Sequence, residues 1–100
     1  MSHPEALDIR RVALDVDKAL KVPTLNEIAS AINRSPGVRA FNITVTEVDQ
    51  ETMGTSVTVE GEQIDYDALV AAIESSGAVV HSLDQIACGD RIIEYVPRAR

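Results

Sequence analysis

The feature that most constrains the fold is a weak internal duplication. A residue suited to capping a helix, Thr24 in one half and Asp65 in the other, begins each of two similar segments. Behind each cap, apolar residues recur at i, i+3, i+4 and i+7, the spacing of one buried helix face. The aligned pairs are Leu25 with Tyr66, Ile28 with Leu69, Ala29 with Val70, and Ile32 with Ile73. The chain therefore predicts two equivalent helices.

Both helices carry recognisable ends. Thr24-Leu-Asn-Glu27 is a capping box, in which the Thr hydroxyl accepts from the third helical amide and Glu27 accepts from the cap amide. Pro36-Gly37 must end the first helix, and Gly77 is suited to the left-handed position after the second. Tyr66, at the first position of its stripe, is expected in the core with its hydroxyl at the rim.

Apolar and polar residues alternate on either side of each helix, which is the period of a half-buried strand. The segment Asp49–Gly54 predicts a hairpin connection between two of the strands. A last apolar run, from Arg91 to Val96, predicts a short fifth strand. The four main alternating stretches are residues 9–17, 41–46, 56–60 and about 79–83.

The order β-α-β-β-α-β predicts an α+β fold, the ferredoxin-like sandwich. Right-handed crossovers place both helices on one face of an antiparallel sheet. We expect a single domain over residues 1–100, with a core at about 9–96 and loose ends at 1–8 and 97–100.

Composition excludes several classes of function. Asp and Glu number 16 against 9 Lys and Arg, a formal net charge of −7. This acidic protein lacks the clustered cations that nucleic-acid binding needs, and three aromatic residues make no base-stacking platform. No apolar segment approaches the roughly 20 residues of a membrane span, and the start of the chain has no signal-peptide pattern. A lone cysteine, Cys88, fits a reducing compartment, so we expect a cytoplasmic protein.

Three segments together carry a resemblance to a known family. Asn42–Asp49, Val59–Gly61 with Ile64–Tyr66, and Gly77–Asp84 resemble the "domain of unknown function" family numbered 211, which is best represented in archaea. The resemblance covers roughly residues 9–96. It implies a ferredoxin-like fold and a homo-oligomer, in the form of a ring, and it implies no established activity or catalytic residue. Cys88 departs from the small or aliphatic residue expected there.

One face of the predicted sheet is left uncovered by the helices. It is polar but rich in uncharged Thr, Asn and Ser, so it is suited either to water or to a partner subunit or small-molecule ligand. The tail Arg91–Val96 has two equal alternatives: strand addition to a neighbouring subunit, or folding back on its own domain. The residues of the uncovered face are Arg11, Ala13, Asp15, Asn42, Thr44, Thr46, Ser56, Thr58 and Glu60.

Acidic residues gather at one end of this sheet. Asp15 and Asp17 end the first strand, and Glu47 and Asp49 end the second. Hard cations such as Ca²⁺ or Mg²⁺ need several oxygen ligands, and a ring would multiply such a cluster. No Asp-x-Asp-x-Asp-Gly loop is present, and acidic surfaces commonly serve solubility alone. These four residues are therefore candidate cation ligands, and simple solvation remains the alternative.

His81-Ser82-Leu83-Asp84 contains the residue types of a hydrolase triad. Neighbouring residues in a strand point to opposite faces, so His81 and Ser82 cannot act as base and nucleophile. His81 could bind zinc only with ligands from other subunits. We therefore expect a non-enzymatic homo-oligomer with a regulatory or binding role. The alternatives are a small-ligand or divalent-cation sensor similar to amino-acid-binding regulatory domains, and an enzyme of unknown class.

Overall fold

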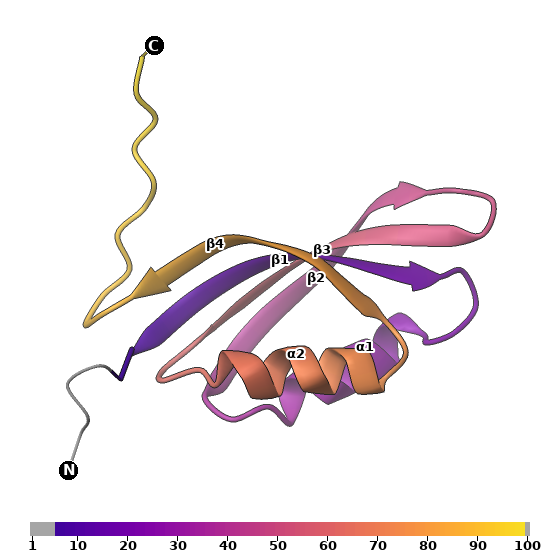
Figure 1. Ribbon diagram of the computed structural model, residues 1–100, viewed down its shortest axis with the longest axis horizontal. Helices are drawn as coiled ribbons and strands as arrows, with labels where there is room; N and C mark the ends of the chain where they lie inside the picture. Colours follow the sequence, from indigo (N-terminus) through magenta and orange to yellow (C-terminus); the bar gives the residue numbers. More distant parts are fainter. Residues whose placement is uncertain (1–5, 100) are drawn as a thin grey trace.

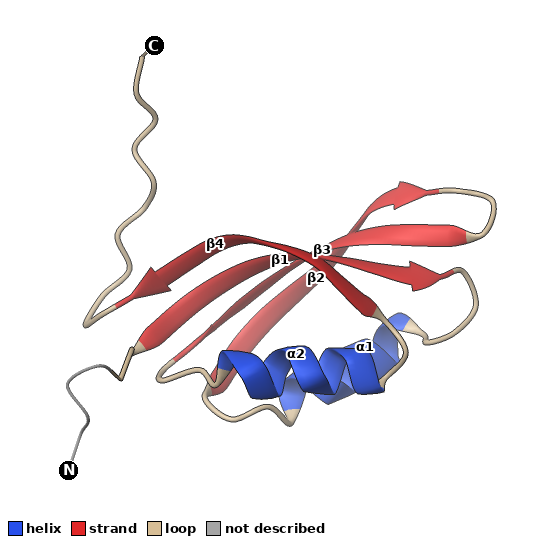
Figure 2. Ribbon diagram, viewed as in Figure 1, coloured by secondary structure: helices blue, strands red, loops and turns tan. Residues whose placement is uncertain are grey.

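The computed structural model describes residues 6–99 and shows one sheet with two helices. The expected order β-α-β-β-α-β is confirmed. Both helices lie against the same face of the sheet (Figures 1 and 2). The elements are β1 (Ile9–Ala19), α1 (Leu25–Asn33), β2 (Val38–Val48), β3 (Thr52–Gly61), α2 (Tyr66–Ser75) and β4 (Val79–Cys88).

The sheet has the strand order β2-β3-β1-β4, and every neighbouring pair is antiparallel. The two inner strands, β3 and β1, come from different halves of the chain, so both halves contribute to the centre of the one sheet. Leu14 of β1 lies opposite Val57 of β3 and Leu83 of β4. Residues that face each other across strands share a face, so this row points toward the helices.

Both helices begin as the sequence predicts. The Thr24 side chain accepts from the Glu27 amide at 3.1 Å, and the Thr24 amide donates to the Glu27 carboxylate at 2.8 Å. Asp65 accepts from the Ala68 amide at 3.0 Å. Each cap satisfies donors that the first helical turn would otherwise leave free.

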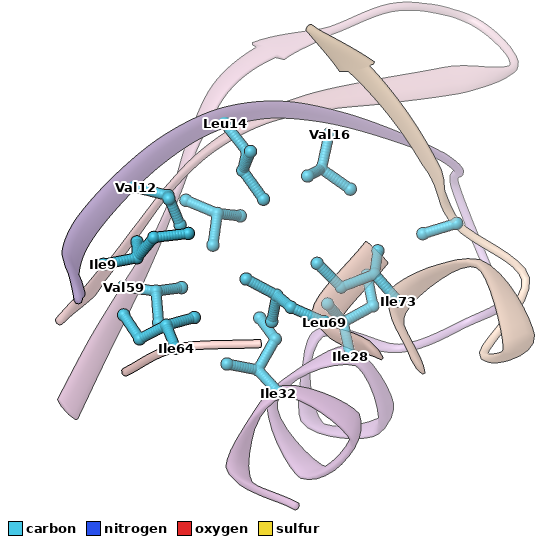
Figure 3. Packing of buried hydrophobic residues seen from close by; sticks show 12 residues of the cluster. Ile9, Val12, Leu14, Val16, Ile28, Ile32, Val59, Ile64, Leu69 and Ile73 are labelled. Atoms are coloured by element: carbon cyan, nitrogen blue, oxygen red, sulfur yellow. The ribbon is translucent and has the colours of Figure 1, made fainter. Parts of the chain in front are cut away.

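The core lies between the helices and the central strands (Figure 3). Most of its side chains are fully buried, and Tyr66 packs against them as a partly buried residue, as expected. The cluster consists of Ile9, Val12, Leu14, Val16, Ile28, Ile32, Val57, Val59, Ile64, Leu69, Ile73 and Ala78.

The strands are longer than the alternation predicts. β4 continues to Cys88 because it pairs with β1 as far as Ile9. Gly54 lies inside β3 and not in the hairpin connection. The residues expected as a fifth strand, Arg91–Val96, belong to no strand of this chain. After Gly89, with φ +112°, the chain leaves β4 and rises on the side away from the helices (Figure 1).

Asp8, directly before β1, makes specific contacts with the rest of the chain. Asp8 is fixed, since its carboxylate accepts from the Gln63 amide at 2.7 Å and from the Arg10 guanidinium at 2.9 Å. Residues 1–5 and 100 lie outside the described residues. Within residues 6–99, no helix is long and apolar enough to cross a membrane.

Candidate functional site

The face of the sheet opposite the helices, called here the open face, carries the candidate cation ligands. Asp17 of β1 lies opposite Gly54 of β3, and Gly54 lies opposite Glu47 of β2. The three residues form one row across adjacent strands. Asp15 lies two residues earlier on β1, so it shares this face.

Gly54 opens a space between two carboxylates. A Cβ atom built on Gly54 would lie 3.6 Å from Asp17 Oδ1 and 3.7 Å from Glu47 Oε1. Both carboxylates therefore approach the same bare stretch of backbone from opposite sides. The sequence pattern predicts Gly54 in the hairpin connection and gives no sign of this position between two acids. Only the strand register reveals it, because register places the glycine between the two acids.

His81 joins the same patch from β4. Its Nδ1 atom lies 3.8 Å from Asp17 Oδ2, and both side chains are about half exposed or more. The pairing of β1 with β4 shifts register between Asp15 and Val16, since Asp15 faces Ser82 and Val16 faces Val80. His81 is the extra residue of that irregularity, which directs its ring toward Asp17.

The other residues of the candidate set make different contacts. Asp49 Oδ1 accepts from the Gln50 amide at 2.9 Å within the β2–β3 turn. Ser82 Oγ donates to Asp84 Oδ1 at 2.8 Å, so Ser82 and His81 contact separate acids. Among residues 6–99 no three His, Cys, Asp or Glu side chains gather closely enough to hold a metal ion. One chain thus offers Asp17, Glu47 and His81 as an incomplete ligand set.

The opposite end of the open face holds a network of ion pairs. Arg11 donates to Glu60 at 2.8 Å and to both carboxylate oxygens of Glu94 at 2.9 Å. These hydrogen bonds raise the pKa of the Arg11 guanidinium, and the bonds that it donates to Glu94 contribute more than the bond to Glu60. Nearby, the hydrogen bond from the Gln63 amide lowers the pKa of Asp8. The network ties the C-terminal tail to the start of β1.

The β4 edge shows a gap in the apolar layer. Leu83 and Ile86 lie opposite the buried residues Leu14 and Val12, so they point to the helix side of the sheet. Nevertheless Leu83 is 41% and Ile86 is 46% exposed. A groove runs between α2 and β4, lined by Tyr66, Asp67, Val70, Ala71, Glu74, Val80, His81, Ser82 and Leu83.

Comparison with known proteins identifies the family. The sequence model of DUF211, described as "Uncharacterized ArCR", matches residues 10–100. The chain belongs to this family. A relative from Methanocaldococcus jannaschii, "Uncharacterized protein MJ0319", is 39% identical over 88 residues, which cover 88% of this chain and 90% of the relative. The resemblance seen in the sequence is therefore confirmed, and the match to the DUF211 family extends over nearly the whole chain.

Proposed function

We propose that this protein is a non-catalytic homo-oligomer with a regulatory or binding role, and that its copies meet at the β4 edge. The observation that carries the proposal is the uncovered apolar row on β4. Leu83 and Ile86 continue the core face of the sheet, yet the helices leave them partly exposed. Apolar groups at an unpaired edge favour a covering partner.

The edge itself supports association. β4 is ten residues long, and among the strands that the structure describes it pairs with β1 alone. Its other side presents backbone donors and acceptors along its length. Val79, at 56% exposed, adds an apolar side chain near the start of the strand. A second chain at this edge would satisfy the backbone groups and cover the apolar residues together.

Native mass spectrometry and light scattering of the purified protein test this function. We expect a multiple of the 10.8 kDa chain mass, and a closed ring is the form that we propose. Ile86→Lys should lower the mass, because a lysine blocks strand pairing at an edge. Asn33→Lys, exposed at the end of α1, is the matched control and should keep the full mass. A monomeric native protein would refute the proposal.

A second function, divalent-cation sensing, is favoured by the arrangement around Gly54. Asp17 and Glu47 present carboxylate oxygens on both sides of that residue, and His81 lies beside Asp17. Ca²⁺ takes six to eight oxygen ligands, more than these side chains provide. We propose that association of copies supplies the missing ligands and that Ca²⁺ or Mg²⁺ binds there.

Calorimetric titration with CaCl₂ and MgCl₂ tests the cation site. We expect saturable binding of one of the two ions and a Tm that rises with its concentration by mass action. Asp17→Asn with Glu47→Gln should abolish both effects. Glu62→Gln, at the other end of the sheet, should leave them unchanged. Equal titration curves for the native protein and the double variant would rule out this site.

A further inference from the structure

The C-terminal segment 91–96 is extended and exposes its apolar side chains. Ile93, Tyr95 and Val96 are 72%, 76% and 71% exposed. The ion pair between Arg11 and Glu94 holds the segment at the start of β1, and beyond it the chain rises away from the sheet (Figure 1). A segment that is held at one point and exposes several apolar side chains is suited to binding another surface.

This segment is directed away from the groove of its own chain. Arg11 directly precedes the buried Val12 on β1, so its side chain lies on the open face, together with the Glu94 carboxylate that it binds. The groove between α2 and β4 lies on the helix side and runs along the start of β4, at Val80–Leu83. The tail leaves from the other end of that strand, after Cys88.

The groove is complementary to the tail in apolar character and in charge. Its apolar lining comes from Val70, Val80 and Leu83, and its acidic side chains are Asp67 and Glu74. The tail carries apolar residues followed by the basic sequence Pro97-Arg98-Ala99-Arg100. In an extended chain, Ile93 and Tyr95 point to the same side, and Glu94 points to the other. The two apolar side chains can therefore enter one groove together.

We propose that residues 91–96 of one copy bind beside β4 of a second copy, with Ile93 and Tyr95 in the groove between α2 and β4. This inference rests on the proposed function and names the segment that covers the β4 edge. Arg98 then lies toward the acidic side of the groove. Because tail and groove are different surfaces, the contact is head-to-tail, and repetition closes a ring or extends a filament.

Point variants of the full chain test the tail. Ile93→Ser with Tyr95→Ser should abolish assembly and leave the 10.8 kDa monomer in native mass spectrometry. Pro97→Ser with Ala99→Ser is the matched control in the same segment and should assemble fully. Full assembly of the Ile93/Tyr95 variant would overturn the tail proposal, while the β4 association tested by Ile86→Lys would stand.

The groove is tested on the other side of the contact. Ala71 is exposed on α2 and lines the groove, so Ala71→Lys obstructs it and adds a charge that repels the basic tail. We expect this variant to be monomeric, whereas Asn26→Lys on α1 should assemble. Unchanged assembly of Ala71→Lys would overturn binding in this groove. The tail would then lie elsewhere, for example against its own β4, where Ile93 and Tyr95 line a second hollow with Gln85 and Ala87.

A mixing experiment makes the assignment specific. The Ile93/Tyr95 variant keeps an intact groove, and the Ala71→Lys variant keeps an intact tail. Mixed in equal amounts, they should form a heterodimer of one chain each, although neither assembles alone. Two separate monomers in the mixture would refute direct binding of the tail in the groove.

Discussion

Two glycines of β3 differ in what surrounds them. A Cβ atom at Gly61 would lie 1.9 Å from the carbonyl oxygen of Gly37, a backbone atom that cannot move independently. Gly61→Ala should therefore lower the free energy of unfolding by about 1–3 kcal/mol, the usual cost of overpacking. The urea midpoint measures this loss. An unchanged midpoint would mean that the segments around Gly37 and Gly61 separate easily.

Gly54 should respond in the opposite way. Its φ is not in the left-handed region, and a Cβ there would meet Glu47 Cβ at 3.4 Å, an ordinary contact. Gly54→Ala should raise the free energy of unfolding by about 0.4–1 kcal/mol, because alanine restricts the unfolded chain. The same methyl group occupies the space between Asp17 and Glu47, so cation binding in calorimetry should weaken. Equally strong cation binding by Gly54→Ala would show that the cation does not lie between these carboxylates.

Asp8 should contribute a pH-dependent part of the stability. The hydrogen bond from the Gln63 amide lowers the pKa of the Asp8 carboxyl. In the folded protein this carboxyl therefore stays charged at pH values below its ordinary pKa of 3.8. The contribution is complete above the unfolded pKa and is lost as pH falls through the lowered value. Asp8→Asn should flatten the fall of Tm between about pH 5 and pH 3, compared with native protein. Asp90→Asn, in the exposed turn after β4, is the control and should keep the native profile.

Individual residues were predictable from the sequence only where local spacing decides their role. The capping box of Thr24 and Glu27 is such a case, since its partners are three residues apart. The contact of Asp17 with His81 is not such a case, because the two residues are 64 positions apart in the sequence and a strand irregularity directs the ring. The sequence named both residues as candidate ligands but could not pair them.

At the scale of elements, each helix depends on a side chain at its start. Thr24→Ala should lower the free energy of unfolding by about 1 kcal/mol, because the Glu27 amide loses its acceptor. Asp65→Ala should cost a similar amount through the Ala68 amide. Urea unfolding measures both. Asn26→Ala, exposed within α1, should shift the midpoint little, and an equal shift would deny the caps their role.

The helices and strands were largely predictable from the sequence, whereas the residues at which they begin and end were not. Hydrophobic period identified two helices and four strands, since one face of each is buried in a common core. The apolar run Arg91–Val96 has the same local pattern but forms no strand here. A strand needs a backbone partner, and within residues 6–99 this segment pairs with no strand. The ion pair of Glu94 with Arg11 holds it at the open face.

At the scale of the whole molecule, the sheet formed by residues 6–99 has two free edges, β2 and β4, and the β4 edge leaves apolar side chains of the core face partly exposed. The sequence predicted which residues face the helices. It could not show that the helices stop short of Leu83 and Ile86, because helix placement follows from packing over the entire sheet.

Because the helices leave these β4 side chains partly exposed, the stability of the fold should depend on association. If copies cover Leu83 and Ile86, the folded state is stabilised by its partner, and Tm must rise with protein concentration. We expect this rise in calorimetric scans over a hundredfold range of concentration. Ile86→Lys should remove the dependence, since it keeps the monomer fold but prevents the contact, and Asn33→Lys should retain it. A native Tm that is independent of concentration would show that β4 remains exposed to water in the folded protein.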